Sequence, residues 1–119
     1  MEEIVSNVLD KKLAARERLT IVFVYTPLCG TCKLAEGMLR VVESSFESLP
    51  MYSLNINHSP TFAQQWKIQS VPCLLVFQKG LGVERIYAFG SIGFLYNKLK
   101  PYATAWTLQK TNTNERGNE

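Results

Sequence analysis

Two cysteines separated by two residues are the part of this sequence best suited to covalent chemistry. They lie in the segment Cys29-Gly30-Thr31-Cys32, between an apolar run over 21–25 and a stretch with helical periodicity. At the start of a helix, residues three apart lie on one side of the first turn, so the two sulfur atoms are within bridging distance. The spacing therefore predicts a dithiol that can form and break a disulfide bond.

The start of a helix also predicts different roles for the two sulfur atoms. Its unpaired N–H groups and partial positive charge stabilise a thiolate, which is the attacking species in thiol–disulfide exchange. Cys29 comes first and outermost, so we predict that it is the nucleophile, with a pKa below the roughly 8.5 of a free thiol. Cys32 lies one turn inside, and we predict that it resolves the mixed disulfide. Gly30 is expected to let the backbone turn tightly between them.

The elements that must position this pair alternate between helix and strand. Apolar residues at helical spacing predict helices, and short β-branched or aromatic runs predict strands. The predicted helices cover 2–16, 32–49, 59–66 and a segment that begins after 91, and the predicted strands cover 21–25, 51–56, 73–77 and 83–89. Pro101 is expected to kink or end the last helix near Lys100.

This order of elements predicts an α/β fold with helices on both faces of a four-stranded sheet. Strand–helix–strand units imply parallel, right-handed crossovers, and the final hairpin adds an antiparallel edge. The 119 residues are enough for one domain, which we place over 1–108. The remaining residues, 109–119, are polar and are expected to form a disordered tail.

Composition excludes several classes of function. A net charge of +3 is too weak and dispersed to predict nucleic-acid binding. No apolar run approaches the roughly 20 residues of a membrane span, and the acidic start of the chain resembles neither a secretory nor an organellar targeting segment. Three cysteines are too few, and odd in number, for a disulfide-stapled secreted scaffold. These features predict a cytoplasmic protein with reduced thiols.

Two other interpretations of the cysteine pair remain open. The pair can be half of a zinc site, although only Cys73 and His58 remain as candidate ligands and no second pair has the usual spacing. The two cysteines can also be without chemistry in a degenerate module. A CxxC near a βαβ pattern in a cytosolic protein favours the redox interpretation, and we predict no metal site. Cys73 is expected to be a small buried hydrophobic residue of its strand rather than a third redox thiol.

Three segments of the chain resemble the thioredoxin family. The first is the buried run that leads into Cys29-Gly30-Thr31-Cys32-Lys33, and the second is Leu54-Asn55-Ile56-Asn57 followed by Ser59-Pro60. The third runs from Ile68 through Val71-Pro72 to Phe77 and is followed by Lys79-Gly80 and Phe89-Gly90. The resemblance implies a thioredoxin-like fold with a central mixed four-stranded sheet and four flanking helices. The family's first edge strand has no clear counterpart in this sequence.

The resemblance also implies how a substrate is held. It implies that the Val71–Pro72 peptide bond is cis, that Pro72 packs beside the two cysteines, and that the backbone of Val71 offers strand-type hydrogen bonds to a substrate segment. It assigns Gly30 and Thr31, between the cysteines, to the same substrate-binding surface. An oxidised protein is expected to contain a Cys29–Cys32 disulfide and to leave Cys73 free.

The sequence departs from the family pattern close to the cysteine pair. Leu28 stands where thioredoxins usually have tryptophan, Gly37 where they have a helix-kinking proline, and Ser53 where they have a lysine. Phe23 stands where they carry a buried aspartate that is thought to help deprotonate the resolving cysteine. Without that carboxylate, resolution of the mixed disulfide is expected to limit turnover.

Together these features predict a thiol–disulfide oxidoreductase that reduces disulfides in client proteins. It is expected to act as a monomer without a metal or organic cofactor. Its electrons would come from a reductase or a low-molecular-weight thiol, and no nucleic acid or membrane partner is expected. The alternative is a thioredoxin-fold interaction module that holds partners in the Val71–Pro72 groove while its cysteines are slow or vestigial.

Overall fold

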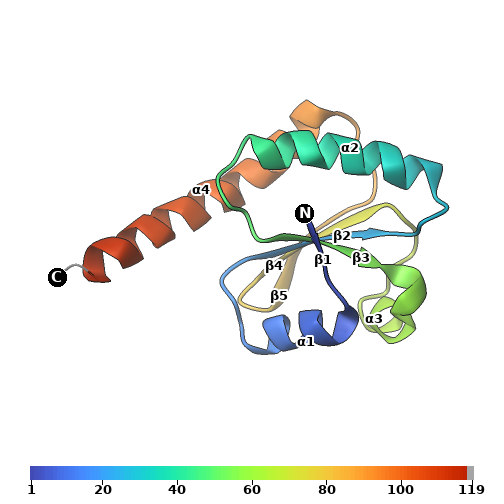
Figure 1. Ribbon diagram of the computed structural model, residues 1–119, viewed down its shortest axis with the longest axis horizontal. Helices are drawn as coiled ribbons and strands as arrows, with labels where there is room; N and C mark the ends of the chain where they lie inside the picture. Colours follow the sequence, from blue (N-terminus) through green and yellow to red (C-terminus); the bar gives the residue numbers. More distant parts are fainter. Residues whose placement is uncertain (118–119) are drawn as a thin grey trace.

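A mixed five-stranded sheet forms the centre of the protein (Figure 1). The computed structural model describes the backbone of residues 1–117 and the side chains of residues 1–109. The strand order is β1-β3-β2-β4-β5, with β1 and β2 parallel to β3, and β4 antiparallel to both β2 and β5. The strands are β1 (Glu2–Glu3), β2 (Thr20–Tyr25), β3 (Met51–Asn55), β4 (Cys73–Gln78) and β5 (Leu81–Ile86).

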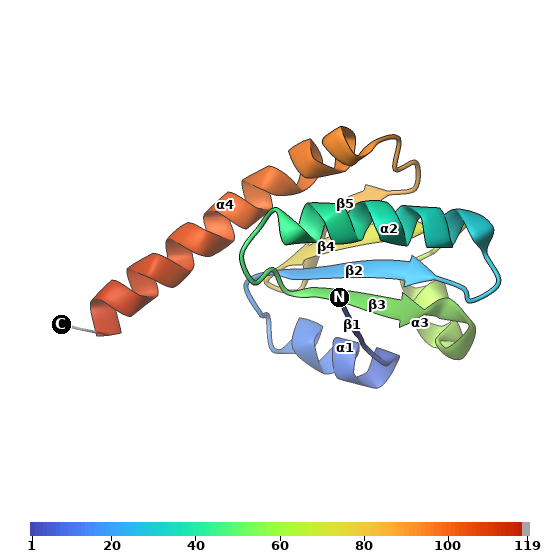
Figure 2. The same cartoon turned by 45° about the horizontal axis from the view of Figure 1, so that its top comes forward.

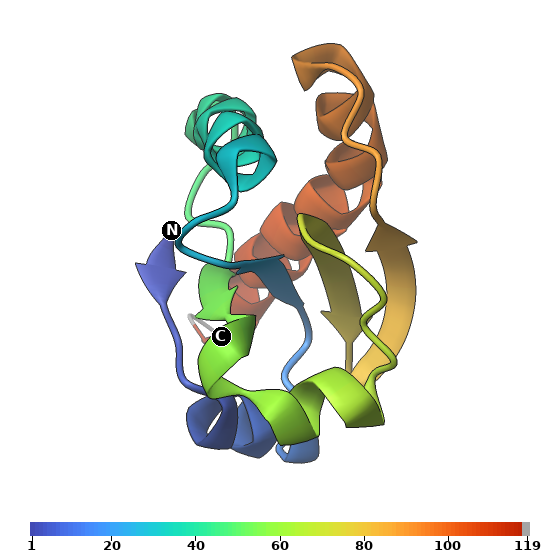
Figure 3. The same cartoon turned by 90° about the vertical axis from the view of Figure 1, so that its right-hand side faces the viewer.

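Helices cover both faces of the sheet (Figure 2, Figure 3). On one face lie α2 (Gly30–Ser44) and α4 (Ile92–Gly117), and on the other lie α1 (Ser6–Ala14) and α3 (Pro60–Gln65), preceded by the 3-10 turn η1 (Ile56–His58). Each face has its own buried apolar cluster, one including Leu39 and Leu95 and the other Leu9 and Phe62. The central strands β2 and β4 are buried from both sides, which explains their unbroken apolar runs. The predicted thioredoxin-like α/β architecture is confirmed.

The sheet has five strands, so the prediction of four strands without the first edge strand is wrong. Glu2 and Glu3 pair in parallel with Tyr52 and Ser53 of β3, and the amide of Ile4 donates to the carbonyl of Ser53 at 2.9 Å. The first helix accordingly begins at Ser6. Two exposed glutamates carry no strand pattern, so only the contact with β3 reveals this short strand.

The sequence predicts a kink or an end of the last helix near Lys100. Pro101 lies inside α4, so the predicted end is wrong and the kink stays a prediction. The proline ring is exposed, while Leu95, Leu99 and Ala103 are buried on the face that packs on the sheet. This apolar stripe holds the helix together on both sides of the proline and offsets the missing backbone donor. The backbone of α4 continues past residue 109. The side chains of residues 110–119 lie outside the described part of the chain, so the disordered tail predicted for 109–119 stays a prediction.

A two-residue turn joins β4 to β5. Lys79 and Gly80 both have positive φ, 53° and 78°, which is typical of a tight hairpin turn whose twist matches the strands. The second strand therefore starts at Leu81, two residues before the predicted start. A Cβ atom on Gly80 would collide with the backbone carbonyl oxygen of Leu13. Glycine is required here by both conformation and space.

Replacing Gly80 by alanine is expected to lower the free energy of unfolding by more than about 1 kcal/mol, because a left-handed conformation and a backbone clash add up. The matched control is Gly37→Ala, since Gly37 lies within α2 with open space around it. That control should instead stabilise by about 0.5–1 kcal/mol. Urea unfolding of both variants measures the difference, and equal effects of the two changes would contradict this account of the hairpin.

Candidate active site

The cysteine pair lies where β2 passes into α2. Cys29 is the N-cap residue of α2, and its Sγ accepts a hydrogen bond from the backbone N–H of Cys32 at 3.1 Å. The Oγ1 of Thr31 lies 3.2 Å from the same sulfur, within hydrogen-bonding distance. The Cys29 sulfur therefore meets two polar groups at a helix N-terminus, which is a suitable environment for a thiolate.

The two cysteines differ in exposure and in acidity. Cys29 is half-buried, whereas Cys32 is only 2% exposed. Hydrogen bonds from the Cys32 side chain and then from Thr31 lower the pKa of Cys29 below its ordinary value. Burial, together with the hydrogen bond to Cys29, raises the pKa of Cys32 to about 11. Both directions agree with a nucleophilic Cys29 and a protonated, inner Cys32.

The Val71–Pro72 segment lies at the same end of the sheet as Cys29. Its peptide bond is cis, and β4 begins at the next residue, Cys73. Because Cys73 pairs with Val24 near the end of β2, this segment flanks the point from which the chain passes into α2. Val71 and Pro72 are half-buried, so part of each remains available to a bound chain.

Cys73 is fully buried in β4. Burial is the main cause that raises the pKa of this thiol to about 11, so it stays protonated near neutral pH. No group of three or more His, Cys, Asp or Glu side chains within the described residues is arranged to hold a metal ion.

Gly30 and Thr31 are exposed in the first turn of α2. The backbone of Gly30 has no positive φ, and a Cβ atom there would meet no atom within 4 Å. Gly30 is therefore not needed for a tight turn, and that expectation is wrong. Its missing side chain instead leaves the surface beside Cys29 open.

The position of the family's buried carboxylate is filled by an aromatic stack. Phe23 is 1% exposed, its ring stacks on Tyr25 with centroids 5.9 Å apart, and Phe89 meets its edge at 6.1 Å. The Tyr25 hydroxyl donates to the carboxylate of Glu3, and burial with this bond raises the pKa of Tyr25 to about 12. The interior below the cysteine pair is thus apolar.

Sequence reasoning missed two features next to the pair. The first is the Tyr25–Glu3 hydrogen bond, which joins residues 22 apart and depends on the short strand β1. The second is the exposure of Leu28, which directly precedes Cys29 and is 98% exposed. Its sequence position marked it as a departure from the family, but only the structure shows an apolar side chain offered to solvent.

A five-stranded α/β sheet with a CxxC pair at a helix N-terminus, beside a cis-proline loop, defines the class of thioredoxin-fold dithiol proteins. The sequence model of the family described as Thioredoxin matches residues 1–92. The chain therefore belongs to the thioredoxin family.

The relatives agree with this assignment. The chain is 43% identical over 100 residues to Thioredoxin-like protein YusE of Bacillus subtilis (strain 168), which covers 84% of this chain and 92% of that protein. It is 26% identical over 77 residues to Thioredoxin-2 of Saccharomyces cerevisiae (strain ATCC 204508 / S288c), covering 65% of this chain and 74% of the relative. Membership of this family supports a role of the thiol–disulfide oxidoreductase type.

Solved structures show the same fold. A mutant thioredoxin from Halobacterium salinarum NRC-1 superimposes with a TM-score of 0.69 at 18% identity, covering 86% of this chain and 91% of that one. Chloroplastic thioredoxin z gives a TM-score of 0.72 at 19% identity, with 85% and 92% covered. Within the described part of this chain, no helix combines the length and hydrophobicity that a membrane span requires.

Proposed function

We propose that this protein reduces disulfide bonds in client proteins by dithiol exchange at Cys29 and Cys32. The observation that carries the proposal is the asymmetry of the pair. The half-buried Cys29 sulfur accepts the Cys32 N–H at 3.1 Å and has a lowered pKa, while the pKa of the buried Cys32 is raised to about 11. The Cys29 sulfur is therefore suited to the first attack, whereas the Cys32 thiol stays protonated until the mixed disulfide has formed.

The exchange proceeds in two balanced steps. The Cys29 thiolate attacks one sulfur of the client disulfide, whose S–S bond breaks, and the other client sulfur leaves as a thiolate. Cys32 then loses its proton and attacks the Cys29 sulfur, which breaks the mixed disulfide and releases the second client thiolate. The client gains two electrons, and the protein ends with a Cys29–Cys32 disulfide. Cys73, buried in β4, stays a free thiol.

The client is held across the end of the sheet. In this proposal the Val71 backbone pairs with an extended client segment, and Pro72 lies against it beside the cysteines. Gly30 and Thr31 are exposed between the two cysteines, and the missing side chain of Gly30 leaves room there for the client. The fully displayed Leu28 adds an apolar contact next to the nucleophile.

No metal or organic cofactor takes part in these steps. A reductase or a low-molecular-weight thiol returns two electrons to the Cys29–Cys32 disulfide. This cycle suits the reducing cytoplasm, and we propose that the protein works there as a monomer through a redox domain over residues 1–108.

The test is the reduction of insulin with dithiothreitol as electron donor, followed by the turbidity of the released chains. The natural protein should accelerate the reaction, and Cys29→Ser should abolish the acceleration because it removes the attacking sulfur. The matched control is Cys73→Ala, which removes a thiol outside the pair and should keep the activity. If the natural protein gave no acceleration above dithiothreitol alone, the oxidoreductase proposal would be abandoned.

One observation favours a second candidate, an interaction module. The apolar Phe23 stack leaves no carboxylate below Cys32, so exchange can be slow while the client surface remains intact. In that case the protein would bind an oxidised client and return it with its disulfide unchanged. Cys29→Ser would then keep full client affinity, and mass spectrometry would find no reduced client.

Alkylation rates give an independent test of the two sulfur roles. A lowered pKa favours the thiolate, so the reaction of Cys29 with iodoacetamide should be lost only when the pH falls below that pKa. Cys32, with a pKa raised to about 11 and 2% exposure, should react far more slowly at every pH below that value. Mass spectrometry of peptides from the folded, reduced protein measures both rates. Equal rates for the two cysteines would rule out the assigned roles.

A further inference from the structure

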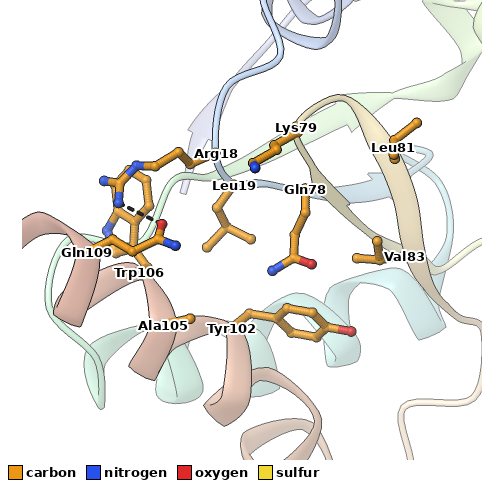
Figure 4. Close-up of a pocket in the computed structure, with 10 residues that line it drawn as sticks. All are labelled: Arg18, Leu19, Gln78, Lys79, Leu81, Val83, Tyr102, Ala105, Trp106 and Gln109. Carbon is orange, nitrogen blue, oxygen red and sulfur yellow. Dashed lines mark hydrogen bonds between the residues drawn. The ribbon is translucent and has the colours of Figure 1, made fainter.

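A cavity lies at the opposite end of the sheet from Cys29 (Figure 4). Arg18 and Leu19 line it just before β2 begins, whereas Cys29 follows the end of that strand. A strand of six residues separates the two places by about 20 Å. The other walls come from the β4–β5 hairpin and from α4, and the volume is about 330 Å³.

Part of this wall lies outside the matched family region. The family match covers residues 1–92, while Tyr102 and Trp106 of α4 line the cavity. The indole Nε1 of Trp106 donates to the carbonyl of Ser48 at 3.2 Å, which fixes α4 against the segment before β3. The last helix of this chain thus supplies one wall of the cavity.

Two cations stand at the rim of the cavity, and no acidic side chain among the described residues lines it. The Arg18 guanidinium lies 4.5 Å from the centre of the Trp106 ring, and its Nη1 donates to Oε1 of Gln109 at 2.9 Å. The Lys79 backbone N–H donates to the carbonyl of Glu17 at 3.0 Å, whereas the Lys79 ammonium has no ion-pair partner among the side chains that the structure describes. The nearby Glu84 is already engaged by the Tyr102 hydroxyl at 2.9 Å and by Lys98 at 3.6 Å.

A neutral polar group points into the same space. Gln78 is half-buried, and its carboxamide projects into the cavity between Leu19 and Val83 (Figure 4). Within the described residues it has no hydrogen-bond partner, although its environment is largely apolar: Leu19 is 4% exposed. The amide atoms of Gln78 are not among the buried atoms without a partner, so solvent can reach them, and a ligand that enters the cavity can replace that solvent.

We propose that this cavity binds a small organic carboxylate. The carboxylate oxygens accept hydrogen bonds from the Lys79 ammonium and the Gln78 amide, while Arg18 adds positive potential. The apolar body of the ligand packs on Leu19 and Val83. A volume of about 330 Å³ lies at the lower end of the range for small-molecule sites, which matches a single ring or a short chain. The site is separate from the cysteine pair and does not depend on exchange chemistry there.

The test is a titration of the isotope-labelled full chain with phenylacetate, followed by NMR. The side-chain amide of Gln78 and the indole N–H of Trp106 should shift along a saturable curve, with a Kd of about 1 mM for a ligand of ten non-hydrogen atoms. Phenylacetamide, which lacks the charge, and acetate, which lacks the ring, should each bind at least about tenfold more weakly.

Variants distinguish binding of phenylacetate in the cavity from non-specific electrostatic attraction to a basic protein. Lys79→Gln should raise the Kd about tenfold, whereas Lys11→Gln, the same charge change on exposed α1, should leave it unchanged. Gln78→Glu should abolish binding by placing a carboxylate in the cavity. The proposal is overturned if no saturable shift appears up to roughly 20 mM phenylacetate. It is also overturned if phenylacetamide or acetate binds the natural protein as tightly as phenylacetate does. The same holds if the folded Lys79→Gln and Gln78→Glu proteins bind phenylacetate as tightly as the natural protein.

Discussion

Replacing Cys32 by serine is expected to turn the protein into a trap for its clients. Cys29 keeps its half-buried, accessible sulfur and still attacks, so a mixed disulfide forms, but no second thiol lies beside it to release the client. An intramolecular thiol has a very high effective concentration, so its loss should slow turnover by at least about a hundredfold at millimolar external thiol. Intact-mass spectrometry after mixing with an oxidised client should show one covalent adduct on Cys29.

The matched control is again Cys73→Ala. Cys73 is 0% exposed and its pKa is raised to about 11, so its removal should leave both the rate and the product unchanged. Serine at position 32 keeps the shape of the side chain, and the fold should persist. An adduct mapped to Cys73, or natural turnover by Cys32→Ser, would show that resolution does not run through Cys32.

Much of the architecture could be predicted because its central strands are unambiguous. The runs 21–25 and 73–77 are apolar at every position, and such runs require cover on both faces of a sheet. The strand β1 could not be predicted, because Glu2 and Glu3 become a strand only through pairing with Tyr52 and Ser53. The local sequence pattern indicates which strands are buried. A two-residue exposed edge strand instead forms only through its tertiary contact with β3.

The candidate site was predictable where its chemistry is local. The CxxC spacing and its place at a helix start are both readable in the sequence, and the directions of the Cys29 and Cys32 pKa shifts follow from that placement. The Tyr25–Glu3 hydrogen bond was not readable, because it joins two strands that are not neighbours in the sheet. The local backbone at Gly30 was also misjudged, since glycine in CxxC does not require a positive φ.

Phe23 decides how fast the second step can be. In the reduced protein, burial is the first cause that raises the pKa of Cys32 to about 11. Because this burial does not depend on the charge of Cys29, we expect Cys32 to be mostly protonated at pH 7 in the mixed disulfide as well. The side chain below it is a buried ring stacked on Tyr25, which offers no base for the proton. Proton loss then depends on water or on the departing client thiolate. We therefore expect release from the mixed disulfide, rather than the first attack, to limit turnover.

Phe23→Asp is expected to accelerate that release about tenfold to a hundredfold near pH 7, in the range of general-base catalysis. It should also lower the free energy of unfolding by several kcal/mol, because an unpaired carboxyl replaces a ring that is 1% exposed. Phe23→Asn is the matched control: it removes the same ring and inserts a polar group of the same size, but it cannot accept a proton from the thiol. Stopped-flow release from a preformed mixed disulfide on Cys29 measures the step. Faster release by Asp but not by Asn supports proton transfer as the limit. If release already matches the first attack in the natural protein, and neither variant changes it, the apolar interior has no kinetic consequence.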